Sequence, residues 1–381
     1  MTKIHKIILI ACSIYFSSTL SSCTTVKTVA GTGVAGCVDG AGLASTFNDP
    51  SGVVTDPWQN IYVADSGCNK IRQVVHGPNN VTSYAGTGTA GCADGNVLTT
   101  ATFRSPVDVA RDTAGNYYVA DQQNHVIRKI DQGSGIVTTV AGQCGQALLP
   151  PQECQEGVKP CLVKTKVPDV VSVKVALFSS PSGVAVDNVG NIYVADYGTC
   201  SVRKIDTKGV VTTVGKKDGE KVPAYATCCG QCTGPFSYPT GIDVDAAGNI
   251  YVVEYWGHKI SKIAAATENI TVLAGSNWGY KDGPGNQAAF MHPYHLVLDQ
   301  ATGDIYVADL GNNRIRKIAN DAAHTVSTLA GDGVLGFKDC TSIGSSVKCA
   351  EFNHPRGIEF VKKLLLYIGD TGNNRIREID P

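Results

Sequence analysis

Six copies of one pattern run along this 381-residue chain, and each copy holds four short apolar runs. The most regular of these runs is centred on tyrosine, as in Asp304-Ile-Tyr-Val-Ala-Asp309. The central residues are Tyr62, Tyr118, Tyr193, Tyr251, Tyr306 and Tyr367, which lie 56, 75, 58, 55 and 61 residues apart by subtraction. A recurrence of this length, with several short runs in each copy, indicates a repeat architecture with one sheet per repeat.

Each copy carries the signals of four strands. The first run follows a Phe-x-x-Pro sequence, and proline suits the first residue of a strand because it has no N–H to donate to the ladder. A turn such as Asp245-Ala-Ala-Gly-Asn249 leads into the tyrosine run, and an Asn-x-Ile-Arg-x-Ile run and a Thr-Val-Ala-Gly run follow. Strands rich in Val, Ile, Tyr and Thr between turn residues predict an all-β fold.

The order of the runs predicts how the two ends of the chain meet. One Thr-Val-Ala-Gly run, residues 26–31, precedes the first complete copy, whereas the chain ends on a third run at 374–379 with no fourth run after it. We therefore expect the N-terminal strand to complete the last sheet. A closed ring of four-stranded antiparallel sheets leaves short, protected edges.

The Tyr-Val-Ala-Asp, Gly-Asn-x-Arg-Ile and Phe-x-x-Pro-x-Gly elements together resemble the NHL repeat over nearly all of residues 23–381. The resemblance implies a six-bladed β-propeller, which would form one domain interrupted by a cysteine-containing insertion at about 143–176. The fourth repeat departs from the pattern, because Glu254 replaces the usual aspartate and Ser261 replaces the arginine.

Residues 1–22 have the features of a signal peptide. Lys3 and Lys6 precede an apolar stretch at 7–16 that is too short to span a bilayer. The sequence Leu20-Ser-Ser-Cys23 resembles a bacterial lipobox, which would make Cys23 the lipidated first residue of an envelope-anchored protein. The alternative is an ordinary cleaved signal and a secreted protein. No other stretch of the sequence could span a membrane.

The cysteines indicate an oxidising compartment. Without Cys12 in the signal and Cys23 at the lipobox, twelve of the 14 cysteines remain, and an even number in an exported chain favours disulfides. Cys340 and Cys349 lie in one loop and form the best-supported pair. Cys37 occupies the column of Cys92 in the next repeat, with Cys68 among its candidate partners, and the remaining connectivity stays open.

Ligand sites of propellers lie at the mouth of the central channel, on loops that a rigid scaffold positions. The column before each proline contains Asp49, Ser105, Ser180, Tyr238, His292 and His354. Two positions after the proline, Asp108 and His295 replace the glycine of the other repeats. The three histidines with Asp49 could bind a divalent cation or act as acid and base, or the histidines could simply hydrogen-bond their turns.

Two further carboxylates, Asp243 and Glu359, share an apolar column of the first strand, where they would line the channel, in contact with water or with a cation. The aspartates that end the tyrosine runs recur in nearly every repeat, so we interpret them as turn-forming residues that pair with the regular arginines. Trp278 and Tyr280 in one loop are candidate ligand contacts, because exposed aromatics anchor sugars and proteins.

These features predict a binding module outside the cytoplasm that holds a protein, peptide or glycan on its loop face. A formal net charge of −1 without a basic block argues against a nucleic-acid partner. The alternative is an enzyme, because six-bladed relatives include metal-dependent lyases and lactonases. The histidine column is filled in repeats five and six alone, so we assign no catalytic residue and no cofactor beyond that candidate cation.

Overall fold

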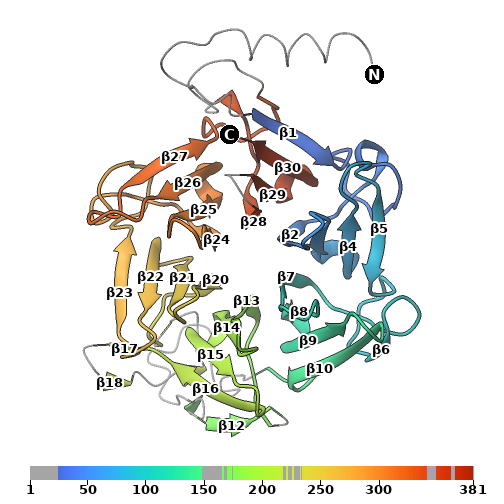
Figure 1. Ribbon diagram of the computed structural model, residues 1–381, viewed down its shortest axis with the longest axis horizontal. Helices are drawn as coiled ribbons and strands as arrows, with labels where there is room; N and C mark the ends of the chain where they lie inside the picture. The colour runs from blue at the N-terminus through green and yellow to red at the C-terminus, as the bar shows by residue number, and fades with distance from the viewer. Residues whose placement is uncertain are drawn as a thin grey trace, which may run out of the picture.

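The computed structural model describes residues 25–147, 165–166, 170–173, 175–217, 220–221, 225–226, 232, 234–340, 349–361 and 365–380. Six antiparallel sheets stand around a central axis as the blades of a propeller (Figure 1). In each blade the strand that begins at proline lies nearest the axis, and the next strands of the chain lie successively outward. The six-bladed all-β fold predicted from the repeats is therefore confirmed.

The blades differ little in the length of their strands. Blades 1 to 3 contain β2 (Pro50–Thr55), β3 (Ile61–Asp65), β4 (Lys70–Val74) and β5 (Val81–Ala85); β7 (Pro106–Arg111), β8 (Tyr117–Asp121), β9 (Val126–Asp131) and β10 (Ile136–Gly142); and β13 (Pro181–Val186), β14 (Ile192–Asp196), β15 (Ser201–Ile205) and β16 (Val210–Val214). Blades 4 to 6 contain β20 (Pro239–Val244), β21 (Ile250–Glu254), β22 (Lys259–Ile263) and β23 (Ile270–Ala274); β24 (Pro293–Leu298), β25 (Ile305–Asp309), β26 (Arg314–Ile318) and β27 (Val326–Ala330); and β28 (Pro355–Phe360), β29 (Leu366–Asp370), β30 (Arg375–Asp380) and β1 (Thr25–Ala30).

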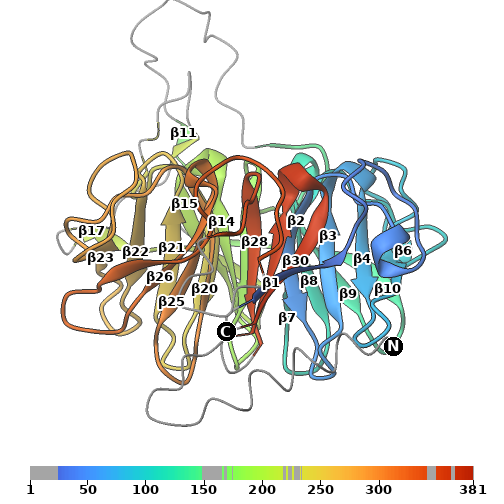
Figure 2. The ribbon, with the colours of Figure 1, turned by 90° about the horizontal axis from the view of Figure 1, so that it is seen from above.

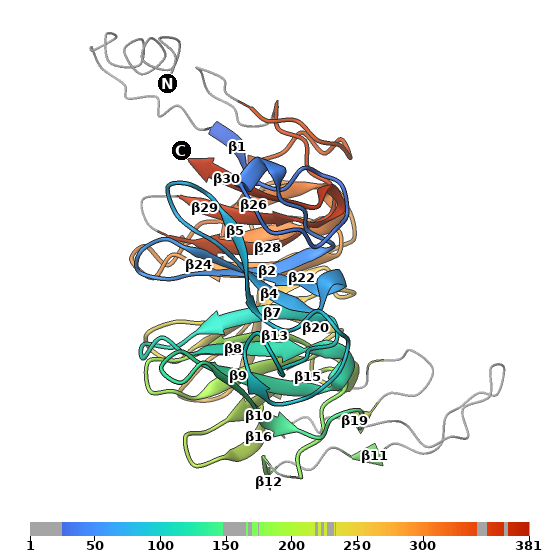
Figure 3. The same ribbon diagram turned by 90° about the vertical axis from the view of Figure 1, so that its right-hand side faces the viewer.

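Shorter elements lie between or outside these strands. Blade 2 gains β6 (Gly95–Asn96) and blade 3 gains β12 (Val170–Ser172), while β11 (Thr165–Lys166) pairs with β19 (Tyr225–Ala226) and β17 (Lys216–Lys217) pairs with β18 (Glu220–Lys221). Short 3-10 turns are η1 (Gly42–Ala44), η2 (Ser66–Cys68), η3 (Gln122–Asn124), η4 (Tyr197–Thr199), η5 (Leu310–Asn312) and η7 (Thr371–Asn373). Seen edge-on, the ribbon of β11 and β19 lies beyond the ends of the blade strands (Figures 2 and 3).

The ring closes as the order of the runs predicts. Strand β1 pairs antiparallel with β30, with Thr25 opposite Asp380 at one end and Ala30 opposite Ile376 at the other. In Figure 1 the blue β1 forms the outer edge of the same blade as the red β30. The N-terminal strand therefore joins the first described residues to the last blade.

The two faces of the ring are distinct. We call the loop face the side on which the inner strands begin at their prolines and on which η2, η3, η4, η5 and η7 lie. These turns are tied to neighbouring inner strands, since the Thr371 hydroxyl donates to the Pro50 carbonyl and the Ser66 hydroxyl to the Pro106 carbonyl, both at 2.6 Å. Strand β30 starts beside η7 on the loop face and runs away from it to Asp380. Thr25 pairs with Asp380, so β1 begins on the opposite face of the ring.

The core consists of apolar clusters between adjacent blades. The phenylalanine of every Phe-x-x-Pro sequence is at most 2% exposed, and these residues are Phe47, Phe103, Phe178, Phe236, Phe290 and Phe352. Phe103, for example, packs with Tyr62 of blade 1 and Val119 of blade 2. Burial of each such ring contributes about 1.5–3 kcal/mol, so the repeated phenylalanine holds consecutive blades together.

Repeated buried ion pairs involve the third strand of the blade, which lies farther from the axis than the inner strand. In blades 1, 2, 5 and 6 an arginine of the third strand contacts the aspartate that ends the second strand at 2.7–3.0 Å, and it also contacts an aspartate of the incoming loop. We call these four arginines, Arg72, Arg128, Arg316 and Arg377, the arginine belt. Each is fully buried, and each lies 5.1–5.3 Å from the centre of a phenylalanine ring.

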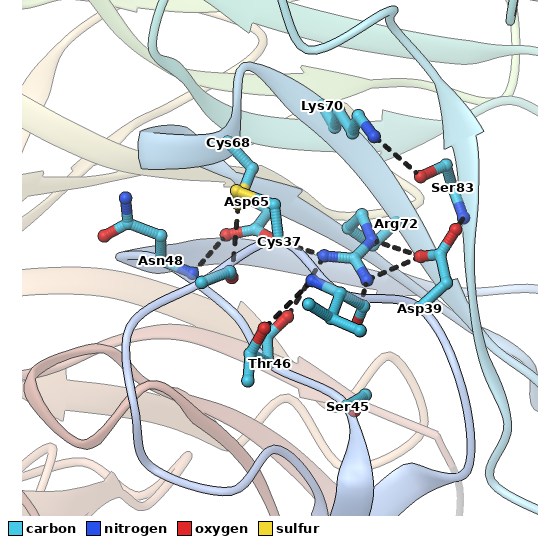
Figure 4. Close-up of polar contacts among 12 residues, drawn as sticks. Cys37, Asp39, Ser45, Thr46, Asn48, Asp65, Cys68, Lys70, Arg72 and Ser83 are labelled. Carbon is cyan, nitrogen blue, oxygen red and sulfur yellow. Dashed lines mark hydrogen bonds and ion pairs between the residues drawn. A yellow bond between two sulfur atoms is a disulfide. The ribbon is translucent and has the colours of Figure 1, made fainter.

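Figure 4 shows this arrangement for Arg72. Its guanidinium donates to Asp65 at 2.9 Å and to Asp39 at 2.6 Å, and Asp39 also accepts the backbone N–H of Ser83. Asp65 in turn accepts the N–H of Asn48, two residues before the strand-initial proline. The aspartates are therefore structural, as the recurrence of their column indicates.

Disulfides join loop segments of the ring. Four lie within the described residues: Cys37–Cys68, Cys92–Cys144, Cys200–Cys232 and Cys340–Cys349. The Cys340–Cys349 pair confirms the prediction made from their shared loop, and Cys68 is the partner of Cys37. No helix in the described part of the chain has the length and apolar character needed to cross a bilayer.

Candidate functional site

The residue before each strand-initial proline has an unusual backbone. All six have φ between 49° and 54°, in the left-handed region that non-glycine residues seldom adopt. In blades 5 and 6 the N–H of this residue donates across the blade boundary: His292 donates to Nδ1 of His258 at 3.1 Å and His354 to Oδ1 of Asn313 at 3.0 Å. These bonds fix both histidines on the loop face.

A pocket of about 680 Å³ opens on the loop face, within the usual size range of small-molecule sites. It is formed by residues at the beginnings of inner strands and in the turns between second and third strands of blades 2 to 6. The described residues that line it are Gln122, Ser182, Tyr197, Thr240, Tyr255, Trp256, Met291, His292, Tyr294, Leu310, Gly311, His354 and Arg356.

One wall of the pocket is aromatic. The rings of Tyr255 and Trp256 lie 4.7 and 4.5 Å from the imidazole of His292, and Tyr255 meets Tyr294 edge-on at 6.3 Å. Trp256 remains 52% exposed, so part of its indole is free to contact a ligand. Burial raises the pKa of Tyr197 and of Tyr255, so both phenols stay protonated and can donate hydrogen bonds at neutral pH.

The polar groups of the pocket are mostly neutral. Burial lowers the pKa of His292, and burial together with the charge of Arg356 lowers that of His354, so both imidazoles are unprotonated at neutral pH. The amide of Gln122 donates to the hydroxyl of Ser182 at 3.1 Å. The side-chain hydroxyl of Thr240 is buried and has no hydrogen-bond partner among the described residues.

An ion pair crosses the axis of the ring. Nε2 of His295 on β24 lies 3.3 Å from Oδ2 of Asp108 on β7, and these strands belong to blades on opposite sides of the ring (Figure 1). Burial lowers the pKa of His295, but Asp108, Asp243 and Glu359 together outweigh burial and leave that pKa raised. The imidazole therefore favours its charged form beside the carboxylates.

Glycines make the room for this pair. A Cβ at Gly52 would lie 2.6 Å from Cα of Asp108, and one at Gly241 would lie 2.5 Å from Cα of His295. The inner strands are therefore too close at this level for side chains in every blade. The two departures from glycine in this column are tolerated because their neighbours in the ring have no side chain.

Three channel carboxylates each bind the next blade. Asp108 accepts the N–H of Val184 at 2.8 Å, Asp243 that of Leu298 at 2.9 Å, and Glu359 that of Thr55 at 3.1 Å. With His295, they line a cavity of about 130 Å³. Burial raises the pKa of Asp243 to about 6 and that of Glu359 to about 7.

The structure does not bring the residues predicted from sequence together in one site. His292 and His354 line the pocket, whereas Asp108 and His295 form the axial pair. Asp49 is not among the described lining residues; its N–H donates to Asn374. Within the described residues, no group of three or more His, Cys, Asp or Glu side chains is arranged to hold a metal ion.

The two loop aromatics predicted as contacts lie outside the described lining of the pocket. Trp278 is 63% exposed, and the ring of Tyr280 packs 3.9 Å from the guanidinium carbon of Arg314 while its hydroxyl is 2.9 Å from that of Thr328. Tyr280 therefore helps to hold its loop on blade 5. Whether either residue contacts a ligand stays a prediction.

Sequence reasoning missed several lining residues that occupy two columns. One column directly follows the second strand, where Tyr197 is aromatic, and the other directly follows the proline, where Tyr294 and Arg356 are large. Other blades have Ser66, Thr371, Ser51 and Val107 at these positions. Aligning the repeats by these columns would have marked the larger residues as departures.

Comparison with known proteins supports the repeat assignment. Residues 178–205, in blade 3, match the NHL repeat. The chain is 28% identical to NHL repeat-containing protein 2 of Bos taurus, over 87% of this chain and 46% of that protein. It is 27% identical to the chloroplastic protein SUPPRESSOR OF QUENCHING 1 of Arabidopsis thaliana, over 88% of this chain and 30% of that protein. The chain thus spans less than half the length of these curated relatives.

Solved structures show the same fold at low identity. An auxiliary nutrient binding protein of Bacteroides thetaiotaomicron superposes with a TM-score of 0.66 at 18% identity, covering 94% of this chain and 76% of that one. A gluconolactonase of Xanthomonas campestris gives 0.55 at 10% identity over 93% and 88% of the two chains. One fold thus occurs in proteins described as binders and as enzymes, so function must be argued from the site.

Proposed function

We propose that the protein is a binding module outside the cytoplasm that holds a small ligand, or part of a larger one, in the loop-face pocket. The observation that carries the proposal is the lining itself: an aromatic wall with an exposed indole opposite neutral hydrogen-bonding groups. Pockets that bind small ligands combine apolar area with a few placed polar groups. The description of a similar structure as an auxiliary nutrient binding protein agrees with this role.

Two exposed tryptophans of the same face provide the test. Trp256 lines the pocket and Trp278 does not. We expect Trp256→Ala to reduce binding in a glycan and peptide array by at least about tenfold, in line with the loss of a buried aromatic contact, and Trp278→Ala to have little effect. The reverse order would move the site to the loop of Trp278, and unchanged binding in both variants would refute a site at either tryptophan.

We further propose that Cys23 attaches the protein to a membrane through lipid. Residues 1–24 lie outside the described residues, but β1 begins at Thr25 on the face opposite the pocket. Lipid at Cys23 would therefore direct the loop face away from the membrane. The disulfides agree with an oxidising compartment. Cys23→Ala should move the protein from the membrane fraction to the soluble fraction, and tight retention on the membrane would refute lipidation.

The metal-dependent lyase or lactonase remains the alternative function. It would place its metal at the channel mouth, where His292 and His354 lie. A stoichiometric divalent ion in the purified protein, lost on substitution of these histidines, would favour the enzyme over the binding module.

A further inference from the structure

Arg356 differs from the arginines of the belt, because it is only partly buried. It directly follows Pro355 in β28, and its guanidinium carbon lies 5.1 Å from the centre of the Tyr294 ring. Each arginine of the belt binds two aspartates, whereas no ion pair or hydrogen bond within the described residues involves the side chain of Arg356. The side chain of Arg356 is partly buried and has no counter-charge among the described residues, so this position suits an incoming anion.

Nothing among the described lining residues competes for that charge. The lining contains no aspartate or glutamate within the described residues, and the imidazoles of His292 and His354 are neutral at neutral pH because burial lowers their pKa. Arg356 is therefore the one fixed charge of the described lining. An anionic ligand would gain a charge-assisted, two-pronged contact, which a planar guanidinium gives to a carboxylate.

The remaining lining suits a hydroxyl-rich ring. Thr240 lines the pocket and is 1% exposed, and its buried hydroxyl has no hydrogen-bond partner within the described residues. The Ser182 hydroxyl, the Gln122 amide and the His354 imidazole add donors and acceptors, while Trp256 supplies a flat apolar surface. Flat aromatic faces beside neutral polar groups match a sugar, whose C–H faces are apolar and whose edges carry hydroxyls.

We propose that the pocket binds a saccharide that carries a carboxylate, a uronic-acid type of sugar. Arg356 binds the carboxylate, Trp256 stacks on a sugar ring, and Thr240 hydrogen-bonds a ring hydroxyl. This inference rests on the proposed function of the pocket and specifies its ligand. A peptide with a free carboxylate offers the same anion, but it lacks the ring that the indole and the neutral polar groups fit.

Calorimetric titration with two matched probes tests the inference. Digalacturonic acid carries carboxylates, and galactobiose is the neutral counterpart. We expect the wild type to bind the acid at least about tenfold more tightly, and Arg356→Gln to weaken acid binding by about 10- to 100-fold, as for loss of a hydrogen-bonded charge. Binding of galactobiose should stay unchanged, and Arg356→Lys should fall in between because lysine keeps the charge but not the fork.

Controls separate this effect from misfolding. Arg104 is exposed and lies two residues before Pro106, outside the described lining. Arg104→Gln should leave both affinities unchanged. If Arg356→Gln melts at a much lower temperature, the wild type alone decides the question, because its affinity for the acid should fall between 50 and 500 mM salt while that for galactobiose holds.

Three outcomes would overturn the inference. Equal affinity for both disaccharides, or tighter binding of a peptide carboxylate, would reject the acidic saccharide and leave the pocket a binding site. An equal loss in Arg104→Gln would reject the role of Arg356. If neither saccharides nor peptides bind the wild type, the proposed function is rejected as well.

Discussion

The arginine belt and the channel axis both bury charge, but they do so in different ways. In the belt the same arrangement recurs in four blades, and each guanidinium is enclosed by two aspartates and backbone carbonyls. At the axis the charges differ from blade to blade, and Oδ1 of Asp108 and Nδ1 of His295 are buried without hydrogen-bond partners among the described residues. A repeated arrangement in which every guanidinium binds two aspartates indicates a structural role, whereas charges that depart from the repeat indicate a site free to change.

The pocket extends this contrast on the loop face. Its large lining residues occupy columns that hold small residues elsewhere, and Arg356 has no described counter-charge. Residues that recur in the repeats therefore build the ring, and residues that depart from the repeat line the pocket, although both kinds lie in the same strands and turns. Substitutions in the belt should affect stability, and those at the axis should affect it much less.

The largest effect is expected for Arg316→Met. The substitution leaves Asp309 fully buried without its partner, which should lower the free energy of unfolding by about 3–5 kcal/mol. Lys317→Met on the same strand removes a partly exposed pair with Asp304 and should cost no more than about 1 kcal/mol. Urea unfolding of both variants measures the difference. A similar small loss in both would show that the belt is not the structural element inferred here.

The belt and the ring are the parts of the fold that sequence could predict. The phenylalanine and the strand-initial proline recur with constant spacing in all six copies, and the aspartate and arginine of the belt columns recur in five, so each follows from local chemistry that the copies repeat. The unpaired run at residues 26–31 predicted closure for the same reason. The pairing of β11 with β19 could not be predicted, because it joins two irregular segments that no repeat relates.

A pH-dependent effect of intermediate size is expected at the axis. The pKa of Glu359 is about 7 in the folded protein against 4.5 for an ordinary glutamate, because the side chain is buried. The folded state therefore holds a proton that the unfolded chain has lost, and stability falls as pH rises from about 4.5 to 7. Asp243, His295 and Asp108 face the same cavity as Glu359. The pH dependence that Glu359 alone contributes is therefore measured by substituting Glu359 and leaving these three residues unchanged.

Glu359→Gln isolates this contribution. At pH 5 the variant and the wild type should unfold at similar urea concentrations, and by pH 8 the variant should be the more stable of the two. A difference that does not change with pH, or one of opposite sign, would show that Glu359 titrates as an ordinary carboxyl in the folded state.

The site was predicted from sequence only in part. His292 and His354 were found because histidine in a column of mixed residues attracts attention, and Asp108 and His295 because they replace glycine. Tyr197, Tyr294 and Arg356 were missed because tyrosine and arginine are common elsewhere in the repeat. Their importance depends on which neighbours they meet across blade boundaries, and spacing along one chain does not reveal that.

The smallest effect is expected for His295→Gln. Glutamine can still donate a hydrogen bond toward Asp108, and Asp108 keeps its bond from the N–H of Val184. The substitution therefore removes only the charge of the imidazole, and the net loss should be about 1 kcal/mol, the difference between a hydrogen bond to a charged group and a typical one. Calorimetric melting of His295→Gln beside Arg316→Met measures both on one scale. A loss at His295 as large as that at Arg316 would make the axial pair a structural element of the same kind as the belt. A small loss would leave the axis as the part of the ring whose charges the fold does not require.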